Sequence, residues 1–404
     1  MKIAIIGAGA AGCFCAVNIK RLHSHCDVEI FESGTRPLAK VAVTGGGRCN
    51  LTNTFQDITS LSDAYPRGDK LMRRALSVFS HEDTMEWFER EGVALTIQED
   101  GCVFPKSQDA MEIVDTLLHL CRKEGIVIHL RTRVNIEELT SGYSVDGKPF
   151  DKIVICIGGC NRLSRLDFLS PFHLDIVPPV PSLFTFNVTG DWQRLLMGTV
   201  VDDVTVSLAG TKFRSRGPLL LTHWGMSGPS ILKLSSYSAR YLAENEYKGV
   251  MNINWCGGKN EEDIRYEIAD MMLTNERKLI TNAYPTYLSQ EHWTILLDRA
   301  NIPHTQRWGA LNRKHVNRLV TVLSSDVYQI TGRPHFKEEF VTAGGISLSN
   351  INIKTLEAKH HPGLYFAGEV LDVDAVTGGF NLQAAWSMAY VVASEIGQER
   401  DNGK

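Results

Sequence analysis

The first 32 residues limit the fold of this chain more than any other stretch. A short apolar run, residues 2–6, leads directly into the glycines of Gly7-x-Gly9-x-x-Gly12, and the apolar spacing after them predicts a helix. A second apolar run, residues 28–31, ends on Glu32, about twenty residues after the last glycine. A strand, a glycine turn, a helix, a second strand and an acid in this order predict a βαβ unit that binds a dinucleotide.

Each part of this unit has a physical role. Gly7 allows the tight turn, Gly9 lets a pyrophosphate approach the backbone, and Gly12 lets the helix pack closely on the strand. The unpaired N–H groups at the helix start attract the phosphates. We expect Glu32 to accept hydrogen bonds from the adenosine ribose hydroxyls and to disfavour a 2′-phosphate. The alternative is a glycine-rich turn without function, and the motif alone does not separate NAD from FAD.

The composition is that of an ordinary globular protein. The 404 residues are enough for about two or three domains, with 43% hydrophobic and 22% charged residues. The net charge of −4 argues against nucleic acid and against a membrane surface as partners. The nine cysteines are scattered without a CxxC pair, which predicts reduced thiols in the cytoplasm and no metal site. No apolar stretch approaches the ~20 residues of a membrane span.

The middle of the first half predicts alternating helices and strands. Residues 77–92 have a helix pattern whose start is marked by Ser80 and Asp83, and residues 108–124 have an amphipathic pattern that ends at Gly125. Residues 99–110 are expected to form a loop between these helices. Apolar runs at 126–134 and 152–159 add strands, so the chain predicts an α/β fold with a parallel sheet.

The composition changes at the proline-rich residues 178–182, which predict a domain exit. A β-rich stretch follows, which suggests a small sheet or barrel. A helical and charged stretch comes next, and α/β character then returns at the C-terminus. Within the β-rich stretch, Ser227 and Pro229 are expected to be the N-cap and the first position of a helix. The expected domains are 1–182 and 346–404 for the dinucleotide domain, 183–258 for the β-rich insertion, 259–328 for the helical insertion and 329–345 for a return strand.

Four blocks of the sequence resemble one known family. They are GAGAAG, VAVTGGGRCNLTN, PLLLTHWGMSGPSILKLS and the long block from TAGGISLSN to GGFNLQAAWS. They resemble the bacterial FAD-binding flavoproteins that include aminoacetone oxidase and a bile-acid reductase, and the resemblance runs from residue 1 to about 396. It implies a glutathione-reductase-like FAD-binding Rossmann domain with an inserted β-rich domain and an inserted helical domain. Cys102 departs from the family, since an arginine is expected before Val103.

The resemblance implies where FAD is held. The first glycine motif and Glu32 meet the adenosine end, residues 45–50 lie along the pyrophosphate and ribityl chain, and the residues around 378–381 face the pyrimidine edge of the flavin. A helix that begins near Asn381 would stabilise negative charge there; the alternative is a plain helix-entry turn. The implied FAD contacts are Gly7, Gly9, Ala10, Ala11, Gly12, Glu32, Ser33, Lys40, Gly45, Gly46, Gly47, Arg48, Cys49, Asn50, Thr52, Val134, Gly158, Gly159, Gly368, Glu369, Asp372, Gly378, Gly379, Phe380 and Asn381.

Two residues are candidates for catalysis. Arg48 follows the triple glycine and is able to reach a phosphate or an anionic substrate, or else is a surface arginine. His223 lies before a predicted helix, and histidine is a residue type that often serves as a proton donor, although a lone histidine is more often structural. Lys40, Arg333 and His335 are weaker candidates. Cys49 has no partner cysteine between residues 50 and 101, so we read it as a small packed residue and not as half of a redox disulfide.

These observations predict an FAD-dependent oxidoreductase. It would transfer a hydride between flavin and a small organic substrate of the amine, ketone or enone class. No second GxGxxG in a strand–helix setting is present, so NAD(P)H would act as a co-substrate without its own domain, and oxygen is the other possible redox partner. The alternatives are a flavin-dependent RNA-modifying enzyme and a non-enzymatic flavin sensor.

Overall fold

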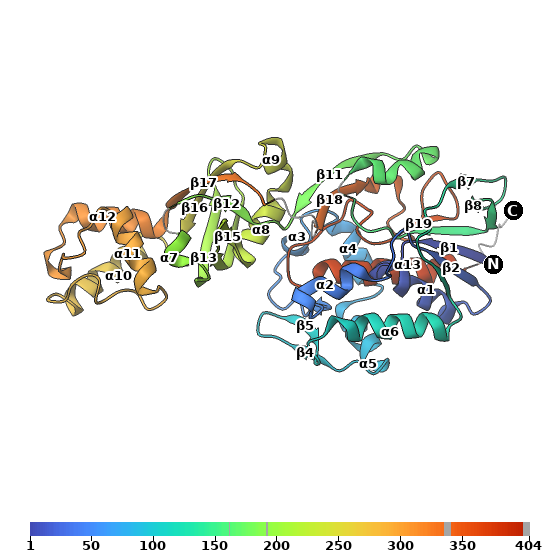
Figure 1. The fold of residues 1–404 in the computed structure, drawn as a ribbon, viewed down its shortest axis with the longest axis horizontal. Coiled ribbons are helices and arrows are strands. Elements are labelled where there is room, and N and C mark those ends of the chain that lie inside the picture. The colour runs from blue at the N-terminus through green and yellow to red at the C-terminus, as the bar shows by residue number, and fades with distance from the viewer. Residues whose placement is uncertain (161, 191–192, 335–340, 399–404) are drawn as a thin grey trace. The chain divides into compact units, whose positions relative to one another are not determined.

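The computed structural model describes residues 1–160, 162–190, 193–334 and 341–398 (Figure 1). The chain divides into two compact units. The first, called unit 1, contains residues 1–180 and 341–404, and unit 2 contains residues 181–340. Each unit is described by itself below.

Unit 1 is built on a five-stranded parallel sheet. Its strands are β1 (Lys2–Ile6), β2 (Asp27–Phe31), β6 (Val127–His129), β10 (Lys152–Ile155) and β19 (Leu364–Phe366), in the spatial order β19-β10-β1-β2-β6. The interior strands are apolar and buried, as expected for a parallel sheet covered on both faces. This confirms the α/β prediction, although the strand expected over 126–134 ends at His129.

One helix of unit 1 lies on strands β1 and β2, and two other helices pack against it. Helix α1 (Ala10–Leu22) contacts both α13 (Phe380–Ile396) and α6 (Ala110–Lys123). Phe14 of α1 contacts Trp386 of α13 with ring centroids 5.2 Å apart, so segments from the two ends of the chain share one core. The predicted helix over 77–92 is α5 (His81–Arg90), with the expected capping box of Ser80 and Asp83. The remaining helical segments of this unit are α2 (Ala39–Gly47), α3 (Leu61–Ala64), α4 (Asp69–Leu76), η1 (Leu163–Phe172) and η3 (Leu348–Asn350).

Two small antiparallel sheets complete unit 1, with a further strand pair. One sheet has the order β3-β5-β4, with β3 at Thr52–Asn53, β4 at Leu95–Ile97 and β5 at Cys102–Pro105. The expected loop over 99–110 is therefore wrong in part, because its centre pairs with β3 and β4. The other strands are β7 (Ile136–Glu138), β8 (Tyr143–Val145), β9 (Lys148–Phe150) and the pair of β11 (Ile176–Ser182) with β18 (Val341–Ile346).

Unit 2 contains a closed antiparallel barrel. Its strands follow the order β12-β15-β14-β13-β16-β17, and closure between β12 and β17 leaves no free edge. The β-rich stretch therefore forms a barrel, one of the two forms expected from the sequence. The strands are β12 (Phe186–Val188), β13 (Val200–Leu208), β14 (Arg214–Leu221), β15 (Gly225–Ser227), β16 (Gly249–Asn254) and β17 (Asp326–Gly332).

Helices α10, α11 and α12 of unit 2 pack together around buried tryptophans, while α8 packs on the barrel strands β13 and β14 (Figure 1). Trp293 and Trp308 are stacked with ring centroids 6.1 Å apart, and both are fully buried. The expected N-cap Ser227 is wrong: it ends β15, and Gly228 takes the cap because its φ of 93° suits glycine. Pro229 does occupy the first turn. The helices are α7 (Gln193–Leu196), α8 (Pro229–Tyr237), α9 (Ala239–Glu244), α10 (Glu261–Thr274), α11 (Gln290–Arg299), η2 (Trp308–Ala310) and α12 (Arg313–Ser324).

Candidate functional site

The first glycine turn has the geometry of a phosphate-binding turn. Gly7 has a φ of 109°, and a Cβ placed on it would lie 2.4 Å from the Cys156 carbonyl oxygen on the neighbouring strand. A Cβ on Gly12 would lie 1.9 Å from the Gly7 carbonyl oxygen. A Cβ on Gly9, by contrast, would meet no atom within 4 Å. Packing therefore requires glycine at positions 7 and 12, while the space beside Gly9 is open to a ligand.

Helices α1 and α13 of unit 1 begin without a side-chain cap, as do the shorter helices α2 and α4. Helix α1 starts after Gly9 and α13 after Gly379, and neither has a capping hydrogen bond or an acid in its first turn. The longer helices α5, α6, α10, α11 and α12 are each capped by a Ser, Asp or Asn side chain. The first N–H groups of a helix need partners. Those of α1 and α13 are therefore suited to oxygen atoms of an anionic or carbonyl-bearing ligand.

Glu32 is held beside the first turn by backbone N–H groups. The N–H of Ala8 donates to one carboxylate oxygen at 2.8 Å, and the N–H of Gly34 donates to the other at 2.6 Å. The neighbouring Ser33 is exposed, with its hydroxyl 3.5 Å from the same carboxylate. The N–H of Thr132 donates to the Glu32 carbonyl, which brings the buried Val134 into the same part of unit 1.

The triple glycine forms a left-handed turn. Gly45, Gly46 and Gly47 have φ values of 59°, 69° and 84°, and the ψ of 151° at Thr44 ends the regular part of α2. Such a conformation costs an L-residue about 1–2 kcal/mol per position, so a run of it is open mainly to glycine. A Cβ on Gly46 or Gly47 would meet no protein atom within 4 Å. All three glycines are thus required by backbone conformation. The space outside Gly46 and Gly47 is open, whereas a Cβ on Gly45 would lie 2.8 Å from the Asn50 backbone nitrogen.

The two residues after the glycines have different environments. Arg48 is exposed, its guanidinium lies 4.5 Å from the centre of the Phe104 ring, and its Nε donates to the Gly45 carbonyl. Cys49 is fully buried, and burial raises the pKa of its thiol to about 12. All nine cysteines are free and buried. These facts agree with Cys49 as a packed residue, because a redox-active cysteine needs an accessible thiolate.

The segment after Cys49 docks onto the start of α13. The Thr52 hydroxyl donates to the Gln383 side-chain oxygen at 2.5 Å, and the Asn53 amide donates to the Gly378 carbonyl at 3.0 Å. With its amide nitrogen toward the Thr52 carbonyl, Asn50 accepts a hydrogen bond from the Gly379 N–H at 3.2 Å. A Cβ on Gly379 would lie 2.3 Å from the Thr52 carbonyl oxygen. The second and the last sequence blocks therefore meet at one place.

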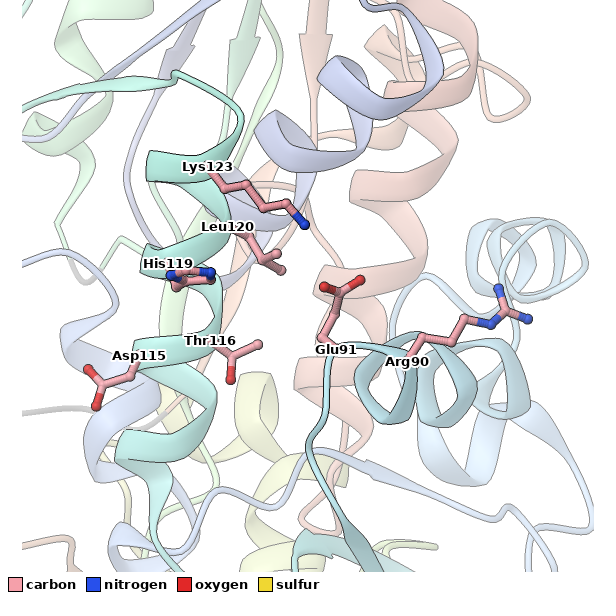
Figure 2. Close-up of a pocket in the computed structure, with 7 residues that line it drawn as sticks. All are labelled: Arg90, Glu91, Asp115, Thr116, His119, Leu120 and Lys123. Carbon is pink, nitrogen blue, oxygen red and sulfur yellow. The ribbon is translucent and has the colours of Figure 1, made fainter.

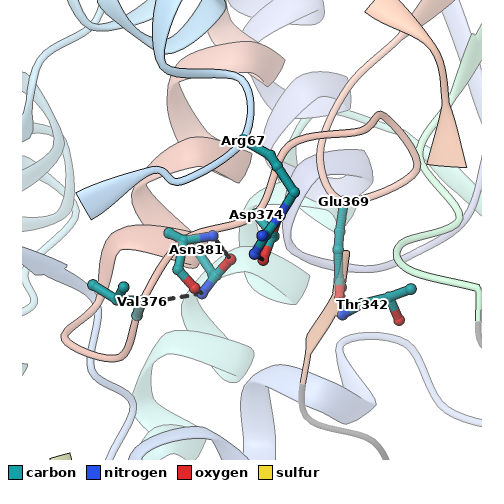
Figure 3. Close-up of polar contacts among 7 residues, drawn as sticks. Arg67, Thr342, Glu369, Asp374, Val376 and Asn381 are labelled. Atoms are coloured by element: carbon teal, nitrogen blue, oxygen red, sulfur yellow. Dashed lines mark hydrogen bonds and ion pairs between the residues drawn. The ribbon is translucent and has the colours of Figure 1, made fainter. Parts of the chain in front are cut away.

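Glu369 connects several other predicted contacts. Its carboxylate accepts the Thr342 N–H at 2.8 Å (Figure 3). It also forms an ion pair with Lys40 at 3.3 Å. A Cβ on Gly159 would lie 2.4 Å from this carboxylate, and one on Gly368 would lie 3.1 Å from the Ala11 Cβ. Residues from four separate stretches thus meet around Glu369, and Gly368 lies beside Ala11 of α1. The backbone of Asp372 is fixed by a bond from its N–H to the Ile346 carbonyl.

The loop before α13 is held by residues that the sequence analysis missed. Arg67 forms a two-pronged ion pair with the buried Asp374 (Figure 3). The Asn381 amide is used within the loop, because its oxygen accepts the Ala375 N–H and its nitrogen donates to the Ala375 and Val376 carbonyls. The Asn381 side chain is therefore already used, and its backbone is the part that is available to contact a ligand. An Arg–Asp pair separated by 307 positions leaves no signal in a single sequence.

Of the two catalytic candidates, Arg48 lies in unit 1 with the predicted FAD contacts, and His223 lies in unit 2. All of the predicted FAD contacts lie in unit 1. His223 lies in unit 2, where it is exposed and its ring centre is 4.3 Å from that of Trp224, so its role stays a prediction. Arg333 also lies in unit 2, with its guanidinium over the Tyr247 ring. His335 lies outside the described residues.

A polar hollow of about 400 Å³ lies between the end of α5 and α6 (Figure 2), and none of the predicted FAD contacts lines it. Its lining residues are Arg90, Glu91, Asp115, Thr116, His119, Leu120 and Lys123. Among the described residues there is no group of three or more His, Cys, Asp or Glu placed to hold a metal ion. None of the helices described is long and apolar enough to cross a bilayer.

Comparison with known proteins identifies the family. The sequence profile of the HI0933-like protein Rossmann domain matches residues 1–395. The chain belongs to this family. It is an FAD-dependent oxidoreductase of the HI0933-like group, which confirms the resemblance found in the sequence and the predicted enzyme class.

Similar proteins extend over nearly the whole chain. Ribosomal RNA dihydrouridine synthase of Escherichia coli is 29% identical over 414 residues, covering 97% of both chains. The 3-dehydro-bile acid delta(4,6)-reductase of Clostridium scindens is 26% identical over 411 residues, covering 96% of this HI0933-like chain and 97% of the relative. Among solved structures, 3-ketosteroid delta1-dehydrogenase of Sterolibacterium denitrificans has a TM-score of 0.51 at 10% identity, covering 98% and 99% of the two chains, which shows a shared fold.

Proposed function

We propose that this HI0933-like oxidoreductase reduces a carbon–carbon double bond conjugated to a carbonyl group, with NAD(P)H as the reductant. The names of its relatives support this. Dihydrouridine is uridine with its C5–C6 double bond saturated, and a delta(4,6)-reductase saturates carbon–carbon double bonds. In both substrates the alkene is conjugated to a carbonyl. Of the amine, ketone and enone classes, the enone class is therefore favoured.

The predicted FAD contacts of unit 1, which we call the FAD cradle, support FAD as the resident cofactor. The open space beside Gly9 and the uncapped start of α1 suit a pyrophosphate, and the fixed carboxylate of Glu32 suits ribose hydroxyls. We propose that Glu369 meets the ribityl chain and that residues 378–381, at the uncapped start of α13, meet the flavin pyrimidine. When bound, FAD supplies the hydride chemistry.

The protein must also stabilise charge and supply a proton. Hydride addition to a conjugated alkene places negative charge on the carbonyl oxygen, and the neighbouring carbon then takes a proton. We propose that the exposed Arg48 binds that oxygen or another anionic group of the substrate, since guanidinium remains charged and offers paired N–H donors. We propose His223 as the proton donor. The nine buried free thiols support a reducing compartment, the cytoplasm.

In a second candidate function, the substrate is RNA and not a free small molecule. Relatives from Escherichia coli and Haemophilus influenzae, at 29% and 27% identity, are both named ribosomal RNA dihydrouridine synthase. This favours a uracil ring within RNA over a free small molecule, against the expectation from net charge. A flavin sensor without turnover is the remaining alternative.

Flavin absorbance tests the proposal. Purified holoprotein should show bound-flavin bands that bleach when NADH or NADPH is added without oxygen. The reduced protein should regain its colour anaerobically with a cyclic enone or with a uridine-containing RNA transcript, and not with the saturated compounds. Bleaching followed by recovery with oxygen alone would contradict the alkene reductase, and failure to bleach with either nucleotide would favour the sensor. His223→Gln should slow anaerobic recovery but leave bleaching unchanged if His223 is the proton donor.

A further inference from the structure

One segment of unit 2 is positively charged, although the net charge of the whole chain is −4. Between Asp298 and Asp326 the sequence contains no Asp or Glu. The same segment contains Arg299, Arg307, Arg313, Lys314 and Arg318, together with two histidines. It covers the end of α11, the turn η2 and the whole of α12.

The fold adds further cations beside this segment. The turn before η2 is held to the residues after α10, because the Arg307 guanidinium donates to the Arg277 carbonyl and the Trp308 N–H donates to the Lys278 carbonyl at 3.1 Å. From the middle of α10, the Arg265 guanidinium donates to the Asn317 side chain of α12 at 2.8 Å. We define the basic strip as Arg265, Arg277, Lys278, Arg307, Arg313, Lys314 and Arg318.

The cations of the basic strip are exposed or half-buried, and no carboxylate among the described residues forms an ion pair with them. Other cations of unit 2 are paired: Arg299 with Asp326, and Arg216 with Asp203. Acids do lie nearby, since Glu276 precedes Arg277 and a group of acids begins α10. The hydrogen bonds of Arg265 and Arg307 go to uncharged groups, so within the described residues the strip presents positive charges without a carboxylate partner.

We propose that the basic strip binds the phosphate backbone of an RNA substrate. This rests on the proposed function, with a uracil ring in RNA as the reduced group. Most of the strip is arginine, whose planar guanidinium fits phosphate oxygens with paired hydrogen bonds. Tyr266 follows Arg265 on α10 with 67% of its side chain exposed, which offers a ring on which an unpaired base can stack. An acidic protein partner would pair with the positive charges but would not need an exposed ring for base stacking.

Binding of labelled RNA tests the strip. The probe is a fluorescein-labelled RNA stem-loop of about 25 nucleotides, followed by anisotropy at several NaCl concentrations. The test variant is Arg313→Glu with Lys314→Glu, because acids in the first turn of α12 favour the helix and leave folding intact. The matched control is Lys212→Glu with Arg214→Glu, an equal change of charge at exposed residues around the β13–β14 turn.

Loss of phosphate contacts has a measurable signature. The wild-type protein should bind with log K falling steeply with log [NaCl], and the test variant should bind at least about tenfold more weakly at low salt, with the slope reduced by about 1.4. The control should bind as the wild type does. Tyr266→Ala should weaken binding without changing the slope.

The contrary results are distinct. Absence of binding by the wild type, equal loss in test and control, or preference for polyglutamate over RNA would overturn the basic strip as an RNA site. NADPH bleaching and enone-dependent recovery, measured on the same proteins, should be unchanged in the test variant. If RNA binds as expected but bleaching or recovery fails in every protein, the proposed reductase function is wrong and the strip stands.

Discussion

Replacing Arg67 by methionine should destabilise unit 1 more than an ordinary surface substitution. The Asp374 side chain is 0% exposed and that of Arg67 is 14% exposed. Removing one member of a buried ion pair costs about 3–5 kcal/mol, because the remaining charge stays desolvated. We expect about 3 kcal/mol, since the guanidinium keeps some contact with solvent. For a unit of this size, that corresponds to a fall in Tm of roughly 6 °C.

The effect should reach the FAD cradle. Residues 64–67 hold the loop before α13 at three points: the ion pair, the Val376 N–H donating to the Ala64 carbonyl at 2.9 Å, and the Tyr65 hydroxyl donating to the Phe380 carbonyl at 3.0 Å. Loosening the first of these should weaken the other two. We therefore expect the apparent affinity for FAD to fall as well, since Phe380 begins α13.

A double-mutant cycle gives the measurement. Urea unfolding of the apoprotein is compared for wild type, Arg67→Met, Asp374→Leu and the double variant. Because the double variant leaves no unpaired charge, its loss of stability should be smaller than the sum of the single losses by at least about 1.5 kcal/mol. The reasoning is refuted if Arg67→Met unfolds within about 1 kcal/mol of wild type, or if the two losses simply add.

Three further predictions concern Glu32, His292 and the buried thiols. Glu32→Arg should reduce the flavin content of purified protein, because the adenosine ribose loses its acceptor; unchanged content by absorbance would contradict that assignment. Burial lowers the pKa of His292 to about 4, so this histidine is neutral in the folded protein while the unfolded chain binds a proton below about pH 6.5. Stability should therefore fall, by up to about 3 kcal/mol, as the pH drops from about 6.5 toward 4. His292→Phe should flatten that part of the stability curve in urea titrations at several pH values; an unchanged pH dependence would mean that the ring is not the responsible group. The nine buried thiols should react slowly with a thiol reagent at pH 8 and quickly in denaturant, and rapid reaction of a native thiol would show an accessible cysteine.

The sequence predicted those parts of the fold that depend on residues close together in the chain. The first βαβ unit follows from apolar spacing and from steric demands at Gly7 and Gly12, and the capping box of α5 follows from Ser80 and Asp83. The triple glycine was assigned to the site through the family resemblance, and the structure adds a physical reason for it. Backbone conformation, and not only lack of room for side chains, requires it.

Long-range pairing explains most of what the sequence did not predict. Strand β5 has a proline and a glycine-flanked start that favour a loop, and it becomes a strand only because Thr52 and Asn53 pair with it from fifty residues away. The Arg67–Asp374 pair needs the tertiary fold to exist at all. The basic strip escaped notice because a net charge of −4 averages over acids elsewhere in the chain.

The division of unit 1 into two stretches sets an order of events during synthesis. Strand β19 and helix α13 are made only after the whole of unit 2, yet β19 pairs with β10 and α13 covers α1. A nascent chain that has reached residue 340 has the adenosine half of the cradle with an uncovered apolar helix beside it. Stable loading of the cofactor must therefore be one of the last steps in maturation, and a ribosome that stalls in unit 2 would release a product prone to aggregate.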